Sequence, residues 1–75
     1  MPNAVHVQPR AQNDWVVTQD GGRELGHYPT KFEAEAVGHK IARKRKVELL
    51  VYDRSGAIER RSRPRKSWFS LLFGG

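Results

Sequence analysis

One segment, residues 30–46, carries the long helical pattern around which the rest of this chain must fold. Thr30 and Glu33 have the spacing of a capping box, in which each side chain bonds the backbone N–H of the other residue. Pro29 disfavours helix for the residue before it, so the start of the helix is well marked. Because 75 residues allow only one small core, this helix must pack on whatever strands the remaining chain supplies.

The predicted helix has two unlike faces. At about 100° per residue, Ala34, Val37, Gly38 and Ile41 fall on one side, with Ala42 at its margin. Basic residues gather on another side and in the last turn, where they suit the helix dipole. We therefore expect the small apolar face, including Ile41, to be buried against a sheet.

Strand patterns lie on both sides of the helix. Before it, residues 4–8 alternate in polarity, residues 15–18 combine Trp with β-branched side chains, and residues 23–27 follow a Gly-Gly turn. After it, residues 47–52 are the most apolar run, expected near the middle of the sheet, and residues 57–61 can return as an edge strand. The predicted fold is α+β: one antiparallel sheet of four to five short strands, in the order β-β-β-α-β-β, packed on a single helix.

The composition changes after residue 61. Residues 62–66 are polar and cationic and include Pro64, which cannot donate to a sheet ladder. We therefore predict a compact domain over residues 1–61, followed by a basic linker and a short, flexible or helical apolar tail over residues 62–75.

The tail concentrates large apolar side chains that are costly to leave in water. It can fold back on the sheet, self-associate, dock on a partner protein as a short helix or, less readily, lie on a membrane surface. Its predicted partner-binding residues are Trp68, Phe69, Leu71, Leu72 and Phe73.

The charge of the chain is strongly uneven. The formal net charge is +6, and all but two of the 14 Lys and Arg residues follow residue 30. Such asymmetry favours anionic partners, with DNA or RNA first. Exposed cations that read no base edge bind phosphates without sequence specificity. The predicted nucleic-acid-binding residues are Lys40, Arg43, Lys44, Arg45, Lys46, Arg60, Arg61, Arg63, Arg65 and Lys66. The alternative interpretation of these residues is a solvated face that confers solubility.

Catalytic and metal-binding patterns are weak. The chain has no cysteine, and its histidines, His6, His27 and His39, are not paired at a ligand spacing. We expect ordinary surface or sheet-packing histidines, no metal, no cofactor and no enzymatic activity. Trp15 and Tyr28 can stack on bases or pack in the core, and core packing is the favoured interpretation for Trp15.

The expected function is therefore a small non-enzymatic binding module that contacts nucleic acid. The alternative is a protein-interaction adaptor that docks through the tail. The first ten residues lack the pattern of a signal peptide, and no apolar run approaches the ~20 residues that span a bilayer, so we expect a cytoplasmic protein.

Four sequence patterns together resemble a small bacterial family, domain of unknown function 2188. They are the strand VHVQP, the Trp-opened strand DWVV, the helix start TKFEAEA with the later KIARK, and the strand and turn ELLVYDRSGAI. Their order and spacing match over residues 5–58. The resemblance implies a compact α+β fold and a bacterial or phage source, and it carries no activity. The basic ARKRK at the helix end and the tail depart from the family pattern.

Overall fold

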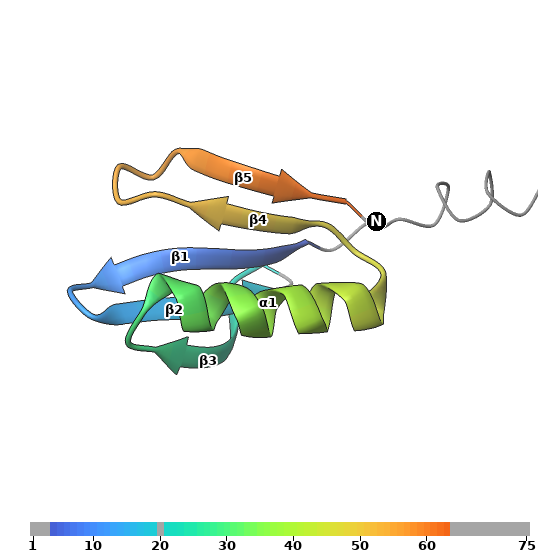
Figure 1. The fold of residues 1–75 in the computed structure, drawn as a ribbon, viewed down its shortest axis with the longest axis horizontal. Coiled ribbons are helices and arrows are strands. Elements are labelled where there is room, and N and C mark those ends of the chain that lie inside the picture. The colour runs from blue at the N-terminus through green and yellow to red at the C-terminus, as the bar shows by residue number, and fades with distance from the viewer. Residues whose placement is uncertain (1–3, 20, 64–75) are drawn as a thin grey trace, which may run out of the picture.

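The computed structural model describes residues 4–19 and 21–63, which form one sheet covered on one face by a helix (Figure 1). The strand order in space is β3-β2-β1-β4-β5. This arrangement confirms the α+β class and the predicted order of elements along the chain. The elements are β1 (Val5–Ala11), β2 (Asp14–Gln19), β3 (Arg23–Tyr28), α1 (Lys31–Arg45), β4 (Leu49–Tyr52) and β5 (Ile58–Ser62).

The sheet is mixed, so the prediction of an antiparallel sheet was wrong for one strand pair. Strands β1 and β4 run parallel, with Val5 opposite Leu49 and Val7 opposite Val51, whereas the other neighbouring pairs are antiparallel. The cause is the helix between β3 and β4. A helical crossover lets β4 run in the same direction as β3, and β3 has the same direction as β1 because both are antiparallel to β2. The helix also carries the chain across β2 and β1, so β4 pairs with the far edge of β1.

The helix begins where its local sequence predicts, and it ends at a residue in a left-handed conformation. The Thr30 side chain accepts a 3.2 Å hydrogen bond from the backbone N–H of Glu33, as the capping-box pattern predicted. At the other end Lys46 adopts a left-handed conformation with φ of 60°, which turns the chain toward β4. The Val47 N–H then donates to the Ala42 carbonyl at 3.0 Å, which satisfies one of the last helical acceptors.

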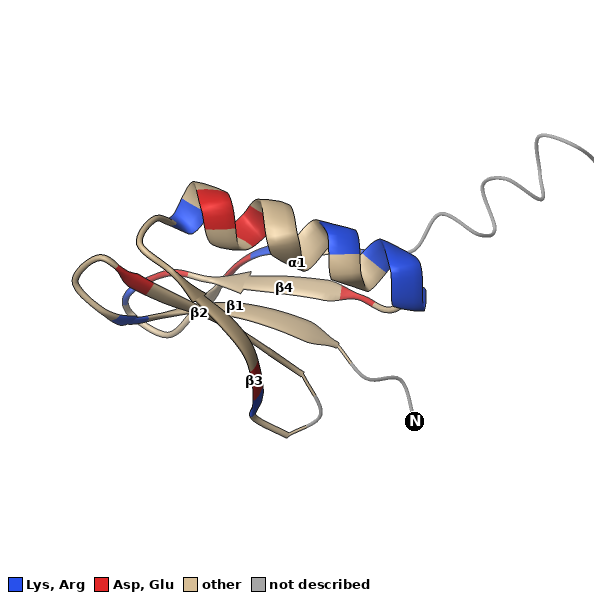
Figure 2. Cartoon of the chain, turned by 90° about the horizontal axis from the view of Figure 1, so that it is seen from below, with Lys and Arg blue, Asp and Glu red and all other residues tan. Residues whose placement is uncertain are grey.

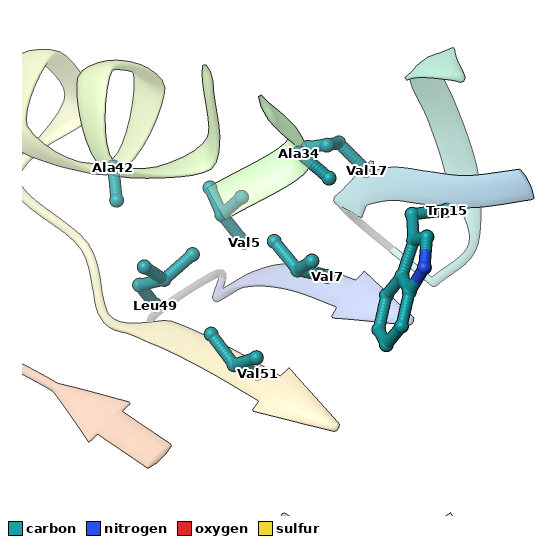
Figure 3. Packing of buried hydrophobic residues seen from close by; sticks show 8 residues of the cluster. All are labelled: Val5, Val7, Trp15, Val17, Ala34, Ala42, Leu49 and Val51. Atoms are coloured by element: carbon teal, nitrogen blue, oxygen red, sulfur yellow. The ribbon is translucent and has the colours of Figure 1, made fainter. Parts of the chain in front are cut away.

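The core lies between α1 and the valine-rich face of the sheet (Figure 3). The helix contributes Ala34, Gly38 and Ala42 to it. An added Cβ at Gly38 would lie 2.9 Å from a Val7 methyl and 3.0 Å from a Leu49 methyl, so only glycine lets the helix approach this closely. The buried face is thus rotated toward Ala42 compared with the predicted one.

Ile41 is partly buried and packs against the edge of the core rather than at its centre. The prediction that Ile41 contacts the sheet side of the domain holds, but its share of the buried area is smaller than the helical pattern indicated. Its replacement will therefore cost less than that of a fully buried aliphatic residue.

A single helix is narrower than the sheet it covers. Four spacings of about 4.8 Å make a five-stranded sheet about 19 Å wide, whereas a helix with its side chains is about 10 Å across. The helix packs on β1, β2, β3 and β4, and Figure 1 shows β5 farther from it, beyond β4. A gap between α1 and β5 is the geometric result.

Candidate nucleic-acid interface

The structure gathers several of the predicted basic residues at one end of the domain, where α1 ends, β4 begins and β5 returns. Because β5 is antiparallel to β4 and Ser62 lies opposite Leu49, the following residue, Arg63, is brought beside the end of the helix. Figure 2 shows the basic side of α1 at this end and its acidic residues near the start. We call this surface the basic end. Its members are Lys40, Arg43, Lys44, Lys46 and Arg63, all exposed.

Arg45 belongs to the same helical turn but has a structural contact. Its guanidinium donates to the side-chain oxygen of Gln19, a buried residue at the end of β2. Arg45 lies seven residues after Gly38 and therefore on the side of the helix that faces the sheet. It contributes charge to the basic end while holding the helix to β2.

The predicted basic residues of β5 lie apart from the helix end. Arg60 Nη1 is 3.1 Å from Glu35 Oε1 on α1, so its charge is paired. Arg61 is opposite Leu50, on the sheet face away from the helix, because neighbouring residues of a strand point to opposite faces. Arg65, Lys66 and the tail residues predicted to bind a partner, Trp68, Phe69, Leu71, Leu72 and Phe73, lie outside the described residues.

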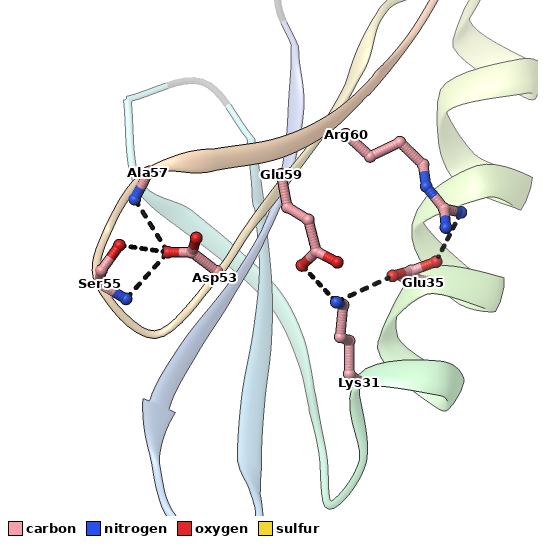
Figure 4. A network of polar contacts seen from close by, with 7 residues as sticks. All are labelled: Lys31, Glu35, Asp53, Ser55, Ala57, Glu59 and Arg60. Carbon is pink, nitrogen blue, oxygen red and sulfur yellow. Dashed lines mark hydrogen bonds and ion pairs between the residues drawn. The ribbon is translucent and has the colours of Figure 1, made fainter.

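Ion pairs join α1 to β5 near the start of the helix (Figure 4). Lys31 contacts the Glu59 carboxylate, and Glu35 contacts Arg60. These contacts cross the gap between helix and hairpin and close it at that end. The adjoining β4–β5 turn is organised by Asp53, whose carboxylate accepts from the Ser55 hydroxyl and from the backbone N–H groups of Ser55 and Ala57, and these bonds lower the pKa of Asp53.

The gap stays open at the other end, beside the basic end. There it forms a groove of about 680 Å³, which we call the C-terminal groove. Its apolar floor consists of Ala42, Val47 and Leu49. Its polar rim consists of His39, Arg43, Ser62 and Arg63.

Sequence reasoning missed two exposed residues. Phe32 is 82% exposed on the outer side of α1, where its position six residues before Gly38 places it away from the buried face. Arg23 lies opposite Gln19 at the start of β3, which brings another cation to the end of the sheet where Arg45 is anchored. The helical period alone would have identified Phe32. Arg23 required the β2–β3 register.

The aromatic residues weighed as base-stacking platforms have structural roles. Trp15 is 7% exposed and belongs to the core, which confirms the core-packing interpretation. The Arg54 guanidinium lies 5.2 Å from the centre of its ring. Tyr28 packs against the same core, and the hydroxyl of Tyr52 is hydrogen-bonded to His6 Nδ1 at 2.9 Å.

The three histidines occupy separate environments. His6 lies on the sheet face away from the helix, where burial lowers its pKa, and His39 lies on the groove rim. His27 bridges two carboxylates: its Nδ1 is 2.9 Å from Asp14 and its Nε2 is 2.9 Å from Glu24. Among the described residues, no group of three or more His, Asp or Glu side chains is arranged to hold a metal ion.

The His27 ion pairs predict a pH-dependent contribution to stability. Hydrogen bonds to Asp14 and then Glu24 raise the pKa of His27 above its ordinary value of 6.5. The protonated form is therefore favoured in the folded state, so the stabilisation is complete below pH 6.5 and is lost as pH rises through the folded-state pKa. At the acid side, bonds from His27 and Arg10 lower the pKa of Glu24 below 4.5, so its contribution is lost only as pH falls through that lowered value.

Thermal melts of the wild type and of His27→Gln test this expectation. The difference in melting temperature will be largest between pH 4.5 and 6.5 and will shrink in more alkaline buffer. His39→Gln, which removes a histidine outside these ion pairs, is the matched control. A His27→Gln effect that keeps the same size from this range into alkaline buffer would contradict the assignment.

The fold and the basic end together define a small α+β domain with a concentrated cationic surface. The chain belongs to the family described as an uncharacterized protein conserved in bacteria (DUF2188), whose model matches residues 5–63. The match covers every described strand and the helix, and it confirms the resemblance seen in the sequence. No curated protein and no solved structure matches the chain.

The family description names no activity, so the candidate interface rests on this chain's own residues. Within the described part of the chain, no helix has the length and apolarity needed to cross a membrane.

Proposed function

We propose that this protein is a small non-enzymatic module that binds nucleic acid without sequence specificity through its basic end. The observation that carries the proposal is the concentration of exposed cations at the end of α1. Lys40, Arg43, Lys44 and Lys46 follow one another over less than two turns, and β5 adds Arg63. The carboxylates of α1 lie near its start, away from these cations.

The positive charges of the basic end favour the binding of phosphate groups. The described acidic group that pairs within it is Glu48, whose Oε2 is 3.1 Å from Arg63 Nε. The remaining cations are exposed, so a phosphate backbone can neutralise them with little desolvation. Each such contact releases counterions from the nucleic acid, which makes the binding strong at low salt and weak at high salt. The proposed contacts are to phosphates, which carry no sequence information, and this supports non-specific binding.

The proposed site is narrower than the set predicted from the sequence. Arg60 lies beside Glu35 near the start of α1, and Arg61 faces the other side of the sheet, so both lie outside the basic end. Arg65 and Lys66 directly follow Arg63 in the sequence and remain in the proposal as further phosphate contacts. The cytoplasm, where nucleic acid is accessible, is the compartment that this function requires.

Titration of fluorescently labelled DNA and RNA with the full-length protein at two salt concentrations tests the proposal. Non-specific binding of this kind has dissociation constants of about 10⁻⁴ to 10⁻⁶ M at physiological salt. We expect dissociation constants within or below that range at low salt, and much larger dissociation constants at the higher salt concentration. Dissociation constants above the millimolar range at low salt would exclude the proposed function.

A second candidate function is an adaptor role for residues 62–75, favoured by the run of large apolar side chains from Trp68 to Phe73. Pulldowns with the full chain and with a chain ending at Arg63 would separate the two functions. The truncated chain is not made shorter than this because β5 extends through Ser62. Loss of a protein partner on truncation, with nucleic-acid binding retained, would favour the adaptor.

A further inference from the structure

Phosphate binding by the basic end does not require the C-terminal groove. It exists because one helix cannot cover five strands, and because the Lys31–Glu59 and Glu35–Arg60 pairs close the gap only near the helix start. Its volume of about 680 Å³ lies within the range of 300–1,000 Å³ that is typical of sites for small organic ligands. The groove is therefore large enough to hold more than a phosphate group.

The lining of the groove has two chemical parts. The floor of Ala42, Val47 and Leu49 offers apolar contact, and the rim places Arg43 on one wall and Arg63 on the other. The Arg63 guanidinium is 3.1 Å from the Glu48 carboxylate, and because this ion pair is exposed a phosphate can compete for the guanidinium. A ligand that fits this lining has an anionic group for the arginines and a weakly polar part for the interior.

An unpaired nucleotide has these two parts. Its phosphate can bind the guanidinium groups in a bidentate manner, and its base can stack on the imidazole of His39 or on a guanidinium plane. Bases in a duplex are stacked within the double helix and cannot enter a groove without being flipped out. The exposed cations of the basic end, by contrast, can contact the phosphate backbone of single-stranded or double-stranded nucleic acid.

We propose that the C-terminal groove binds one unpaired nucleotide, so that the protein prefers single-stranded to double-stranded nucleic acid. This inference rests on the proposed function and names its substrate class. The preference is diagnostic because electrostatics alone acts in the opposite direction: a duplex carries the higher charge density and gains more from counterion release.

Phe32 is the competing platform for a base, since it is the most exposed aromatic side chain among the described residues. Its surroundings are unfavourable for a phosphate. Glu33 and Glu35 lie in the same stretch of helix, and Lys31 is already engaged by Glu35 and Glu59. A nucleotide stacked on Phe32 would therefore place its phosphate next to carboxylates, whereas one in the groove places it next to arginines.

The test compares a polythymidine strand with a duplex of the same length, both labelled, by fluorescence anisotropy on the full-length protein at one moderate salt concentration. We expect the single strand to bind about tenfold tighter, the effect of one stacked base. A polyuridine strand is measured in parallel to compare RNA with DNA. If neither form binds, the proposed function itself has failed. If the duplex binds at least as tightly as the strand, the basic end stands and the groove inference is overturned.

Two variants and one control test whether the base of the bound nucleotide lies in the groove. Ser62→Leu narrows the groove without adding charge or an aromatic ring, and His39→Ala removes a stacking surface with a residue that favours helix. Each should lower single-strand affinity about three- to tenfold and leave duplex affinity and the melting temperature unchanged. Phe32→Ala should leave the preference intact. Loss of the preference in Phe32→Ala, with both groove variants behaving as wild type, would overturn the inference.

Discussion

Leu49→Ala lowers the free energy of unfolding by about 2–5 kcal/mol, the range for large-to-small changes in a packed core. Leu49 is fully buried, pairs in register with Val5, and has a terminal methyl against Gly38. A Val7 methyl also lies against Gly38 and stays in place in the variant, so it limits how far the helix can move inward to fill the cavity that alanine leaves. Domains have total stabilities of about 5–15 kcal/mol, so the variant loses a large share of its stability and melts at a clearly lower temperature.

Chemical denaturation of a matched series checks this expectation. Ile41→Ala, at the edge of the core, will show a smaller loss than Leu49→Ala. Ile58→Ala, on the edge strand and 46% exposed, will change the free energy of unfolding by less than about 1 kcal/mol. A larger loss for Ile41→Ala than for Leu49→Ala would show that the helix is rotated relative to the structure described above.

The double variant Arg43→Gln, Lys44→Gln loses about a hundredfold in nucleic-acid affinity at 50 mM salt. Counterion release at this ionic strength makes each phosphate contact worth about tenfold in affinity, and the variant removes two. Both side chains are exposed on the last turns of α1, so the fold loses only the favourable interaction of two cations with the helix dipole. The loss of affinity will therefore exceed what any change in stability explains.

Arg54→Gln is the control for this variant. Arg54 is also an exposed arginine, but it lies in the β4–β5 turn at the opposite end of the sheet, above Trp15. We expect it to retain affinity within about twofold of wild type under the same conditions, because it makes no phosphate contact. Equal losses in both variants would show that net charge, rather than the basic end, governs binding.

The sequence predicted those parts of the fold that local chemistry determines. The helix and its Thr30 cap depend on neighbouring residues, and the structure reproduces them. The pairing of β1 with β4 depends on where a crossover returns the chain, and hydrophobic patterns carry no information about that. The presence of a helix between two strands of one sheet was the signal that favoured a parallel pair.

The residues of the candidate site also fall into those placed by local sequence and those placed by strand pairing. Lys40, Arg43 and Lys44 share a surface because the helical period places them there. Whether Arg60 joins them depends on the register of β5, which sets it opposite Val51 and within reach of Glu35. The mismatch in width between one helix and five strands follows from the predicted elements, but the place of the groove depends on the strand order, which puts β5 at the edge beyond β4.

The salt dependence of duplex affinity tests the role of the basic end most directly. If each of the five residues of the basic end contacts a phosphate, a plot of the logarithm of the binding constant against that of salt concentration will have a slope of about −4.5, and it will be steeper if Arg65 and Lys66 add contacts. The double variant Arg43→Gln, Lys44→Gln will have a slope smaller in magnitude by about two. Parallel plots for wild type and variant would contradict the assignment, since they would place the phosphate contacts elsewhere on the protein.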